Sequence, residues 1–559
     1  MRQAGVKKAG TTLLLGLALS APAVAQTQQE LNQAASTPER VLMQGMNYGA
    51  QRFSPLASIN KKTVHNLSAT WNYSLNNSMG QEAQPIIADG VMYVTTHNAT
   101  IAINALTGRQ IWKNEIDYAA DVAKMACCGL VNRGAAMLDG VIFRTTLDAQ
   151  VIALDAKTGQ ERWKATAADY KLGYSMTVAP LIANGVLITG ISGGEYGTRG
   201  FLDGWDPATG QKLWRRYTTA LKGEPGGDTW PDDKAEKGGA PTWLTGSYDP
   251  ELDLLYWGTG NGGPWNAEAR KGDNLYIASV LAMRPKTGEI VWFYQFTPND
   301  LYDYDGVNEL VHATLSIDGK PRKVIMQANR NGFFYVIDRI NGKLLAANAF
   351  VKQNWADKID MTSGRPVESA VTMRIRAGAG EEVFPSAFGG KNWMPMSFNP
   401  ATGLVYANTL NVSFPYKLAK PDYKQGEWYL GAELTGFNLP KDEPRGYLKA
   451  IDPLTGKSKW EMPWKELPSF SGTLSTAGGL VFSGGMNGEF LALDADNGKK
   501  LWQFQTGSGI IGQPVTWSHQ GKQYVTILSG MGSLWNVTGD EHLRNVPAGG
   551  SVWTFALHR

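Results

Sequence analysis

The sequence predicts an all-β protein, an eight-bladed β-propeller of four-stranded antiparallel blades with tryptophan-docking motifs. Three observations support this prediction. The chain of 559 residues is rich in glycine (64) and tryptophan (19), which favours many turns and many large packing anchors. Hairpin dipeptides such as Asp89-Gly90 and Asn184-Gly185 recur before apolar segments. A longer motif returns eight times, and repeats on this scale are typical of propellers and solenoids.

The repeated motif is an apolar strand, then Ala/Asp-x-x-(Thr/Asn)-Gly, then a tryptophan after a short gap. Six complete copies span residues 102–112, 153–163, 205–214, 283–292, 451–460 and 493–502. Two shorter copies, 337–342 and 398–403, lack the tryptophan. The eight glycines lie 42 to 78 residues apart. Eight copies therefore predict eight blades.

Packing physics explains why this motif favours a ring. A four-stranded sheet cannot bury both of its faces alone, whereas blades stacked radially bury them on their neighbours. A tryptophan at a fixed blade position can wedge between two blades and bury about 150–250 Å². The Thr-Gly turn is expected to hold the register. We expect Trp71 and residues 552–555 to share one sheet and so close the ring.

The N-terminus predicts export. Arg2, Lys7 and Lys8 precede a short apolar run, and Ala23-Val24-Ala25 offers a cleavage site. We expect residues 1–25 to be a signal peptide and residues 26–559 to be the propeller domain. No later apolar run reaches about 18 residues, so no transmembrane segment is expected, and in a Gram-negative cell the location is the periplasm. Net charge is +3 with dispersed charges, which argues against a nucleic-acid partner.

The only two cysteines, Cys127 and Cys128, are adjacent. Adjacent Cα atoms lie about 3.8 Å apart, below the usual disulfide range, so a bond between them closes a small ring. Two free thiols side by side would be vulnerable in an oxidising compartment. A vicinal disulfide is therefore favoured over two unrelated thiols.

A second pair of like residues lies in the segment 296–308, where Asp303 and Asp305 flank Tyr304. In an extended segment these carboxylates point to the same side, and they repel each other unless a cation or a proton lies between them. One interpretation is a hard metal ion with a general base. The other is a polar loop whose carboxylates are solvated or cap turns.

Several motifs, in order, resemble those of the quinoprotein alcohol dehydrogenases, periplasmic eight-bladed propellers that bind pyrroloquinoline quinone (PQQ) and a metal on the propeller axis. The resemblance covers nearly all of the mature chain and begins at residues 52–60. It includes Cys127-Cys128 with Val131-Asn-Arg-Gly134, then Ser192-Gly-Gly-Glu-Tyr-Gly-Thr-Arg-Gly200. It continues through Tyr256-Trp-Gly-Thr-Gly-Asn-Gly-Gly-Pro-Trp265, Asp303 and the stretch 329–338.

The resemblance implies roles for particular residues. It implies Asp303 as the catalytic base and Arg330 as the arginine beside the quinone oxygens and the metal. The implied metal ligands are Glu195, Asn261, Asp303 and Asp305. The implied PQQ contacts are Glu82, Cys127, Cys128, Arg133, Thr177, Ser192, Gly193, Gly194, Trp243, Arg330, Asn392, Trp393 and Trp535.

The disulfide is expected on one face of the quinone and Trp243 on the other, because a planar tricarboxylate needs flat walls and fixed cations. Alternatives remain: Arg133 as a surface ion pair, and Trp243 as a docking or core tryptophan. Trp535 departs from the family pattern, since the chain reads Gly-Ser-Leu-Trp where Gly-Gly-Trp is usual.

The four implied metal ligands are all oxygen donors, which indicates a hard cation. Asp305 resembles the lanthanide-dependent branch, since calcium-dependent members have a small or neutral residue there. An extra carboxylate offsets the third charge of a trivalent ion. A lanthanide(III) is therefore favoured over Ca²⁺.

By resemblance, the metal and Arg330 polarise the quinone C5 carbonyl and Asp303 takes the hydroxyl proton. Hydride from a small primary or secondary alcohol then passes to C5, giving an aldehyde or ketone. No Cys-x-x-Cys-His motif exists, so we expect no c-type haem and a separate acceptor, a soluble cytochrome c.

Two alternative functions stay open: a calcium-dependent quinoprotein acting on sugars, polyols or bulky secondary alcohols, and a non-catalytic propeller scaffold. A homodimer is also left open. Two segments, 222–239 and 408–446, interrupt the repeat rhythm. We expect them to wall the substrate mouth or the acceptor surface, or to be plain surface loops.

Overall fold

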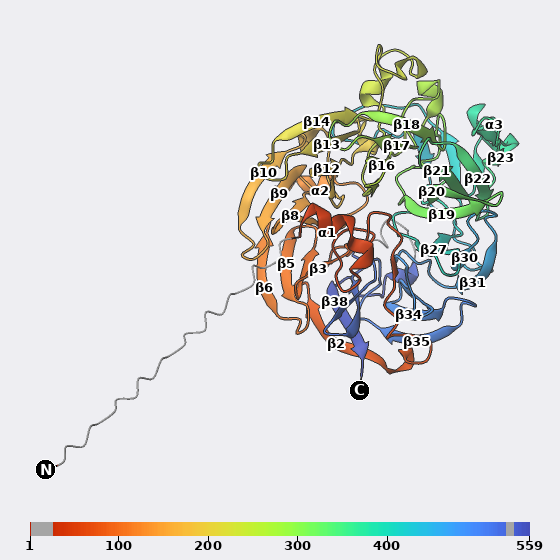
Figure 1. The fold of residues 1–559 in the computed structure, drawn as a ribbon. Helices are drawn as coiled ribbons and strands as arrows, with labels where there is room; N and C mark the ends of the chain where they lie inside the picture. The colour runs from red at the N-terminus through yellow and green to blue at the C-terminus, as the bar shows by residue number, and fades with distance from the viewer. Residues whose placement is uncertain (2–25, 533–540, 559) are drawn as a thin grey trace.

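Eight antiparallel sheets, each with four blade strands, stand side by side in a ring, seen end-on in Figure 1. The computed structural model describes residues 1, 26–532 and 541–558. The expected signal peptide and Trp535 lie outside these residues, apart from Met1. In the first four blades the first strand is fully buried, whereas the fourth strand is partly exposed, so these blades run from a buried inner strand to a solvent-facing outer strand. The predicted eight-bladed fold is confirmed.

Blades 1 to 4 follow one another without interruption of strand order. Their strands are β3 (Ile86–Ala88), β4 (Val91–Thr95), β5 (Ala99–Asn104) and β6 (Gln110–Glu115); β7 (Ala136–Leu138), β8 (Val141–Thr145), β9 (Gln150–Asp155) and β10 (Glu161–Thr166); β11 (Leu181–Ala183), β12 (Val186–Gly190), β13 (Phe201–Trp205) and β14 (Lys212–Tyr217); and β15 (Ser247–Asp249), β16 (Leu254–Gly258), β17 (Ser279–Met283) and β18 (Ile290–Gln295).

Blades 5 to 8 complete the ring, and blade 7 gains a fifth, parallel strand, β1 (Phe53–Ser54). Their strands are β19 (Val311–Ile317), β20 (Lys320–Ala328), β21 (Phe333–Asp338) and β22 (Leu344–Ala349); β26 (Ser397–Asn399), β27 (Leu404–Leu410), β30 (Gly446–Ile451) and β31 (Ser458–Trp464); β32 (Leu474–Thr476), β33 (Leu480–Gly484), β34 (Glu489–Asp494) and β35 (Lys500–Gln505); and β36 (Val515–His519), β37 (Lys522–Ser529), β38 (Ser551–Leu557) and β2 (Leu67–Ser74).

Blade 8 closes the ring with strands from the two ends of the chain. β2 pairs antiparallel with β38, placing Trp71 opposite Thr554 and Tyr73 opposite Val552. This confirms the predicted pairing of the N-terminal strand with residues 552–555. The two terminal strands lie together at the lower edge of Figure 1.

The motif tryptophans dock on the next blade. The Trp112 indole N–H donates to the Ala156 carbonyl oxygen (3.0 Å), and its ring covers Gly159. Gly159 has φ +73°, and a Cβ there would lie 2.5 Å from the indole, so the turn requires glycine. The same stacking joins Trp71 to Gly108, Trp163 to Gly210, Trp214 to Gly288, Trp292 to Gly342 and Trp460 to Gly498.

The motif copy at residues 398–403 lies at a different turn of its blade from the other seven copies. Residues 398–403 connect β26 and β27, the first two strands of blade 6, and a Cβ on Gly403 would meet nothing within 4 Å. Blade 6 docks instead through its 451–456 copy, where Asn348 Nδ2 donates to the Leu454 oxygen (2.9 Å) in place of a tryptophan. Eight copies therefore do not mean one copy per blade, because blade 8 has no such turn.

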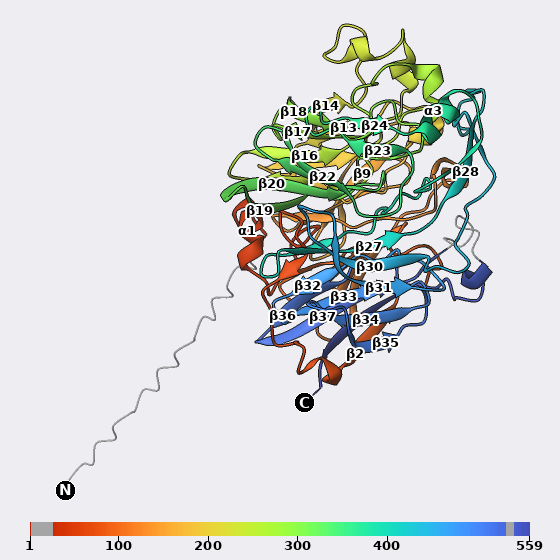
Figure 2. The same cartoon turned by 90° about the vertical axis from the view of Figure 1, so that its right-hand side faces the viewer.

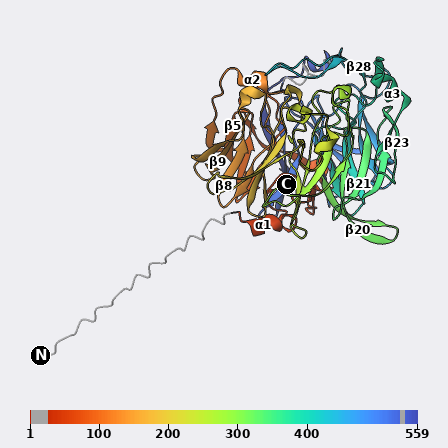
Figure 3. The same cartoon turned by 90° about the horizontal axis from the view of Figure 1, so that it is seen from above.

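The remaining elements decorate the ring. Two small sheets combine β23 (Ala356–Ile359) with β24 (Pro366–Glu368), and β25 (Glu381–Val383) with β28 (Phe414–Leu418) and β29 (Ala432–Leu434). The helices α2 (Val122–Met125) and α3 (Ala370–Arg376) lie with β28 on one face, and α1 (Gln28–Asn32) lies on the opposite face (Figure 3). The 3₁₀ helices are η1 (Ala34–Ser36), η2 (Val64–Asn66), η3 (Tyr170–Leu172), η4 (Gly194–Tyr196), η5 (Gly227–Thr229), η6 (Lys234–Lys237), η7 (Ala267–Arg270) and η8 (Glu541–Leu543).

The two interrupting segments have different surroundings. Segment 222–239 folds over blade 4 through Trp230, whose indole N–H donates to the Leu275 oxygen (2.6 Å). Segment 408–446 leaves from β27, forms β28 and β29, and returns as β30; in Figure 2 its strand β28 lies on the face of the ring opposite α1. No helix in the described part of the chain is long and apolar enough to cross a membrane.

Candidate active site

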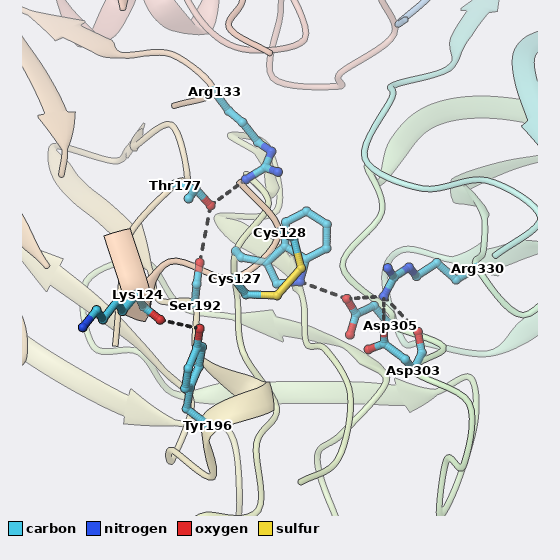
Figure 4. Close-up of a disulfide and its surroundings, with 11 residues drawn as sticks. Lys124, Cys127, Cys128, Arg133, Thr177, Ser192, Tyr196, Asp303, Asp305 and Arg330 are labelled. Carbon is cyan, nitrogen blue, oxygen red and sulfur yellow. Dashed lines mark hydrogen bonds and ion pairs between the residues drawn. A yellow bond between two sulfur atoms is a disulfide. The ribbon is translucent and has the colours of Figure 1, made fainter. Parts of the chain in front are cut away.

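A disulfide joins Cys127 and Cys128 immediately after α2, as the sequence predicts (Figure 4). Cys128 adopts a positive φ of 67°. The Tyr196 hydroxyl donates to the Lys124 carbonyl oxygen (3.0 Å), so the turn η4 supports the helix that carries the disulfide. The disulfide therefore lies beside the predicted metal-motif turn.

A buried arginine, Arg133, forms one end of the site. Its guanidinium pairs with Glu82 (2.7 Å) and donates to Thr177 Oγ1 (2.5 Å). It also lies over the Trp243 ring, 4.7 Å from the centroid. Arg133 is only 7% exposed, so the surface ion-pair alternative is wrong. The Nε of Arg133 is buried without a hydrogen-bond partner in the described residues, which leaves a donor free for an anionic group.

A second buried arginine, Arg330, forms the other end. Its Nη1 donates to Asp305 Oδ2 (2.8 Å) and to the Asp303 carbonyl oxygen (2.8 Å), and lies 3.2 Å from Asp303 Oδ2. The Trp243 indole N–H donates to the same Asp305 oxygen (2.9 Å). Figure 4 shows the disulfide between these two arginine clusters. Trp243 thus contacts both ends and is not an interblade docking tryptophan.

The oxygen donors at this second end fit a cation. Asn261 Oδ1 and Asp303 Oδ1 are buried and have no hydrogen-bond partner in the described residues. The Asn261 backbone N–H donates to Asp305 Oδ1, which brings the two loops together. A Cβ on Gly194 would lie 2.6 Å from Asn261 Oδ1, so the turn before Glu195 also reaches this point. Unpaired amide and carboxylate oxygens are the ligands that hard metals take.

The electrostatics also favour a cation. Burial, then the charge of Asp305, raises the pKa of Glu195 to about 7. Burial raises the pKa of Asp303 well above its usual range, with Asp305 and Glu195 adding to the shift against Arg330. Three carboxylates facing one arginine are short of positive charge. Among the described residues, no three His, Cys, Asp or Glu side chains lie close enough together to form a metal-binding group by themselves.

The other predicted contacts surround the same axis. Thr177 Oγ1 lies 3.4 Å from Ser192 Oγ, next to Gly193 and Gly194. Trp393 stacks on Phe470 (centroids 5.0 Å apart), and Asn392 Oδ1 accepts the Trp393 backbone N–H (2.9 Å). Arg133 and Trp393 line a common cavity of about 50 Å³. Trp535 lies outside the described residues.

The structure adds residues that the sequence reasoning missed. Arg52 is fully buried and donates to Gln84 Oε1 (2.5 Å) and Gln513 Oε1 (3.1 Å). Gln513 in turn donates to the Glu82 carbonyl oxygen (3.0 Å), so this network backs the Arg133 end. Its sequence signal was present, because Arg52 begins the N-terminal motif at 52–60.

The segment 408–446, expected to wall the substrate mouth or the acceptor surface or to be a plain surface loop, contacts the metal-motif turn. The Tyr429 backbone N–H donates to the Glu195 carbonyl oxygen (2.6 Å). A Cβ on Gly197 would lie 2.9 Å from Tyr423, so this segment covers the turn that carries Glu195.

Comparison with known proteins identifies the family and supports the fold. The family model of the PQQ glucose/ethanol/alcohol dehydrogenase β-propeller domain matches residues 43–348 and 442–525. The chain belongs to the PQQ-dependent alcohol dehydrogenase family. It is 42% identical to the quinohemoprotein alcohol dehydrogenase ADH IIB of Pseudomonas putida, over 97% of this chain and 81% of that protein.

Two further relatives carry a metal in their names. A lanthanide-dependent methanol dehydrogenase of Methylacidiphilum fumariolicum is 38% identical, over 96% of this chain and 92% of that protein. The solved structure of a europium-containing methanol dehydrogenase superposes with a TM-score of 0.89 at 36% identity, covering 95% of this chain and all of that chain. The protein is therefore a PQQ-dependent alcohol dehydrogenase, and the alternative of a non-catalytic scaffold is wrong.

Proposed function

We propose that this enzyme is periplasmic and oxidises small primary or secondary alcohols to aldehydes or ketones by hydride transfer to PQQ. One metal ion, a lanthanide(III) rather than Ca²⁺, completes the site, and electrons leave to a soluble cytochrome c. The observation that carries the proposal is Trp243. Its indole contacts the Arg133 end and the Asp305 end together, so one flat surface spans an anion-binding and a cation-binding end.

The chain supplies the surfaces that would hold PQQ. Trp243 and the Cys127–Cys128 disulfide are the flat walls, and Arg133 is the fixed cation for a carboxylate. Glu82 and Thr177 orient Arg133. The other predicted PQQ contacts are Ser192, Gly193, Gly194, Asn392 and Trp393.

At the other end, Glu195, Asn261, Asp303 and Asp305 would hold the metal. Bound PQQ would supply the hydride acceptor, and a bound metal would supply Lewis-acid polarisation of the quinone. Asp303 takes the hydroxyl proton of the alcohol on its carboxylate. Arg330 holds the backbone and side chain of Asp303 and the side chain of Asp305 in one cluster, so the base is oriented by two contacts.

The donor set supports the choice of a trivalent ion. Three carboxylates and one amide supply formal charge −3, and Asp305 is the carboxylate that the calcium form would not need. The lanthanide and europium in the names of two relatives agree with this choice. Calcium-dependent oxidation of a sugar, polyol or bulky secondary alcohol is the competing assignment.

Reconstitution tests the function. The metal-stripped protein is loaded with PQQ and either La³⁺ or Ca²⁺, and a dye-linked assay is run over a panel of primary alcohols, secondary alcohols, polyols and sugars. We expect turnover of small alcohols with La³⁺ and a visible PQQ spectrum. Equal or better turnover with Ca²⁺, or activity confined to sugars, would contradict the proposal.

A further inference from the structure

Three of the four predicted metal ligands lie on two loops of blade 4, whereas Glu195 lies on η4 of blade 3. The loop after β16 carries Asn261, and the loop after β18 carries Asp303 and Asp305. Two direct hydrogen bonds join these loops near the ligands, from the Asn261 backbone N–H to Asp305 Oδ1 and from the Gly306 backbone N–H to the Thr259 carbonyl oxygen (2.9 Å). Ligand spacing also depends on the side chains that hold the rest of the two loops together.

Arg270, at the end of η7, belongs to the same loop as Asn261 and is fully buried. Its Nε donates to the Pro264 oxygen (2.7 Å), and its Nη2 donates to the Asp300 backbone oxygen. A Cβ on Gly262 would lie 2.3 Å from the Arg270 Cζ, so the guanidinium packs flat on the residue that follows Asn261. One side chain thus contacts both ligand-bearing loops.

Asp300 shapes the second loop from inside. Its Oδ1 accepts the Tyr302 backbone N–H (3.1 Å), and its Oδ2 accepts the Tyr304 backbone N–H (3.0 Å). These two amides flank Asp303, which has a φ of +64°. A positive φ costs energy in a non-glycine residue and persists only when its surroundings hold it. The Asp300 carboxylate supplies part of that restraint.

Other side chains hold the Arg270 guanidinium in place. Asn274 Oδ1 accepts from Arg270 Nη1 (2.7 Å) and from Asn299 Nδ2 (2.9 Å). Asn299 in turn accepts from Arg376 of α3 (2.8 Å). Each of the three guanidinium nitrogen atoms of Arg270 therefore has an acceptor, an arrangement that a lysine could not reproduce.

We propose that Arg270 and Asp300 are positioning residues that set the separation of Asn261 from Asp303 and Asp305, and so tune metal affinity without touching the metal. This inference rests on the proposed metal site. Partners that orient ligands typically change metal affinity or activity by about 10–100-fold when mutated. A merely structural role would lower stability and leave affinity unchanged.

The test uses Asp300→Asn and Arg270→Lys in the full chain, loaded with PQQ and stripped of metal. Asparagine keeps one acceptor oxygen and loses the second, so one flanking amide is released. Calorimetric titration with La³⁺ should show about 10–100-fold weaker binding in each variant. The KM for alcohol at saturating La³⁺ should stay unchanged while kcat falls.

A matched control is Asp452→Asn. Asp452 Oδ1 also accepts two backbone amides, from Leu454 and Thr455 (both 2.9 Å), but in the docking turn between β30 and β31. Because one asparagine oxygen can accept both amides, this variant controls for the loss of a turn carboxylate charge and should keep wild-type La³⁺ affinity.

The outcomes separate the two proposals. If Asp303→Asn weakens La³⁺ binding but Asp300→Asn and Arg270→Lys do not, the positioning role of Arg270 and Asp300 is wrong. The proposed metal site would still stand. If the wild type binds neither La³⁺ nor Ca²⁺, the metal site itself is wrong. If Arg270→Lys fails to fold, Asp300→Asn decides, because it preserves shape and an acceptor.

Discussion

The two ends of the site each place a buried arginine beside carboxylates and the Trp243 ring, but their net charges differ. Arg133 and Arg330 are both buried, and they lie 4.7 Å and 5.9 Å from the Trp243 ring centroid. Arg133 meets one carboxylate, Glu82. Arg330 contacts two, Asp303 and Asp305, with the Glu195 charge also acting on it. The first end is therefore neutral with a spare donor, and the second is short of positive charge.

This difference teaches how one flat surface can orient an asymmetric ligand. A spare guanidinium donor selects a carboxylate, whereas unpaired carboxylate and amide oxygens select a hard cation. Variants at each end should therefore fail in different assays. If variants at one end also weakened ligand binding at the other end, the two ends would not be functionally separate.

The largest effect is expected at Asp303. Asp303→Asn removes the proton acceptor while keeping shape and burial, and a positioned base contributes about 10²–10⁴-fold to rate. We expect kcat to fall by that factor in the dye-linked assay with PQQ still bound by its absorption spectrum. Normal turnover in this variant would refute the base assignment.

A smaller effect is expected at Arg133. Arg133→Gln removes a charge-assisted donor worth about 1.5–3 kcal/mol, which corresponds to about 10–100-fold weaker PQQ binding. Titration of the apoprotein with PQQ measures this loss, and La³⁺ affinity of the PQQ-saturated variant should be unchanged. Weakened La³⁺ binding there would show that the two ends are not independent.

The smallest effect on the site is expected at Gly159, in the docking turn between β9 and β10. Gly159→Ala places a methyl against Trp112 at a φ of +73° and should lower the free energy of unfolding by about 1–3 kcal/mol. Thermal unfolding measures the loss. Affinity for PQQ and La³⁺ should not change, because this glycine contacts neither end, and a change in either affinity would contradict that separation.

Much of the fold was predictable because it is local and repeated. Turn chemistry and a tryptophan at fixed spacing define each docking turn, and the closing strands carry alternating apolar residues. The motif at 398–403 misled the count because the same turn chemistry suits any hairpin, so the sequence does not say which hairpin.

The site divides in the same way. Glu195, Asn261, Asp303 and Arg330 lie in recognisable motifs, and the structure gathers them. Arg52 and Arg270 have no motif that predicts their partners, since their contacts depend on packing between segments distant in sequence. The Asp300 carboxylate accepts from backbone amides of its own loop, and no side-chain pattern predicts that turn. Tyr429 is missed for the same reason, because an insertion has no repeat position from which its neighbours follow.

The central claim is that the Asp303–Asp305 end is built for a trivalent cation, and one titration tests it. Metal-stripped, PQQ-loaded wild type and Asp305→Ala are titrated calorimetrically with La³⁺ and with Ca²⁺. We predict that the wild type binds La³⁺ more tightly than Ca²⁺, and that Asp305→Ala loses at least about 10-fold in La³⁺ affinity with a smaller loss for Ca²⁺. Tighter Ca²⁺ binding in the wild type, or an unchanged preference in Asp305→Ala, would contradict it.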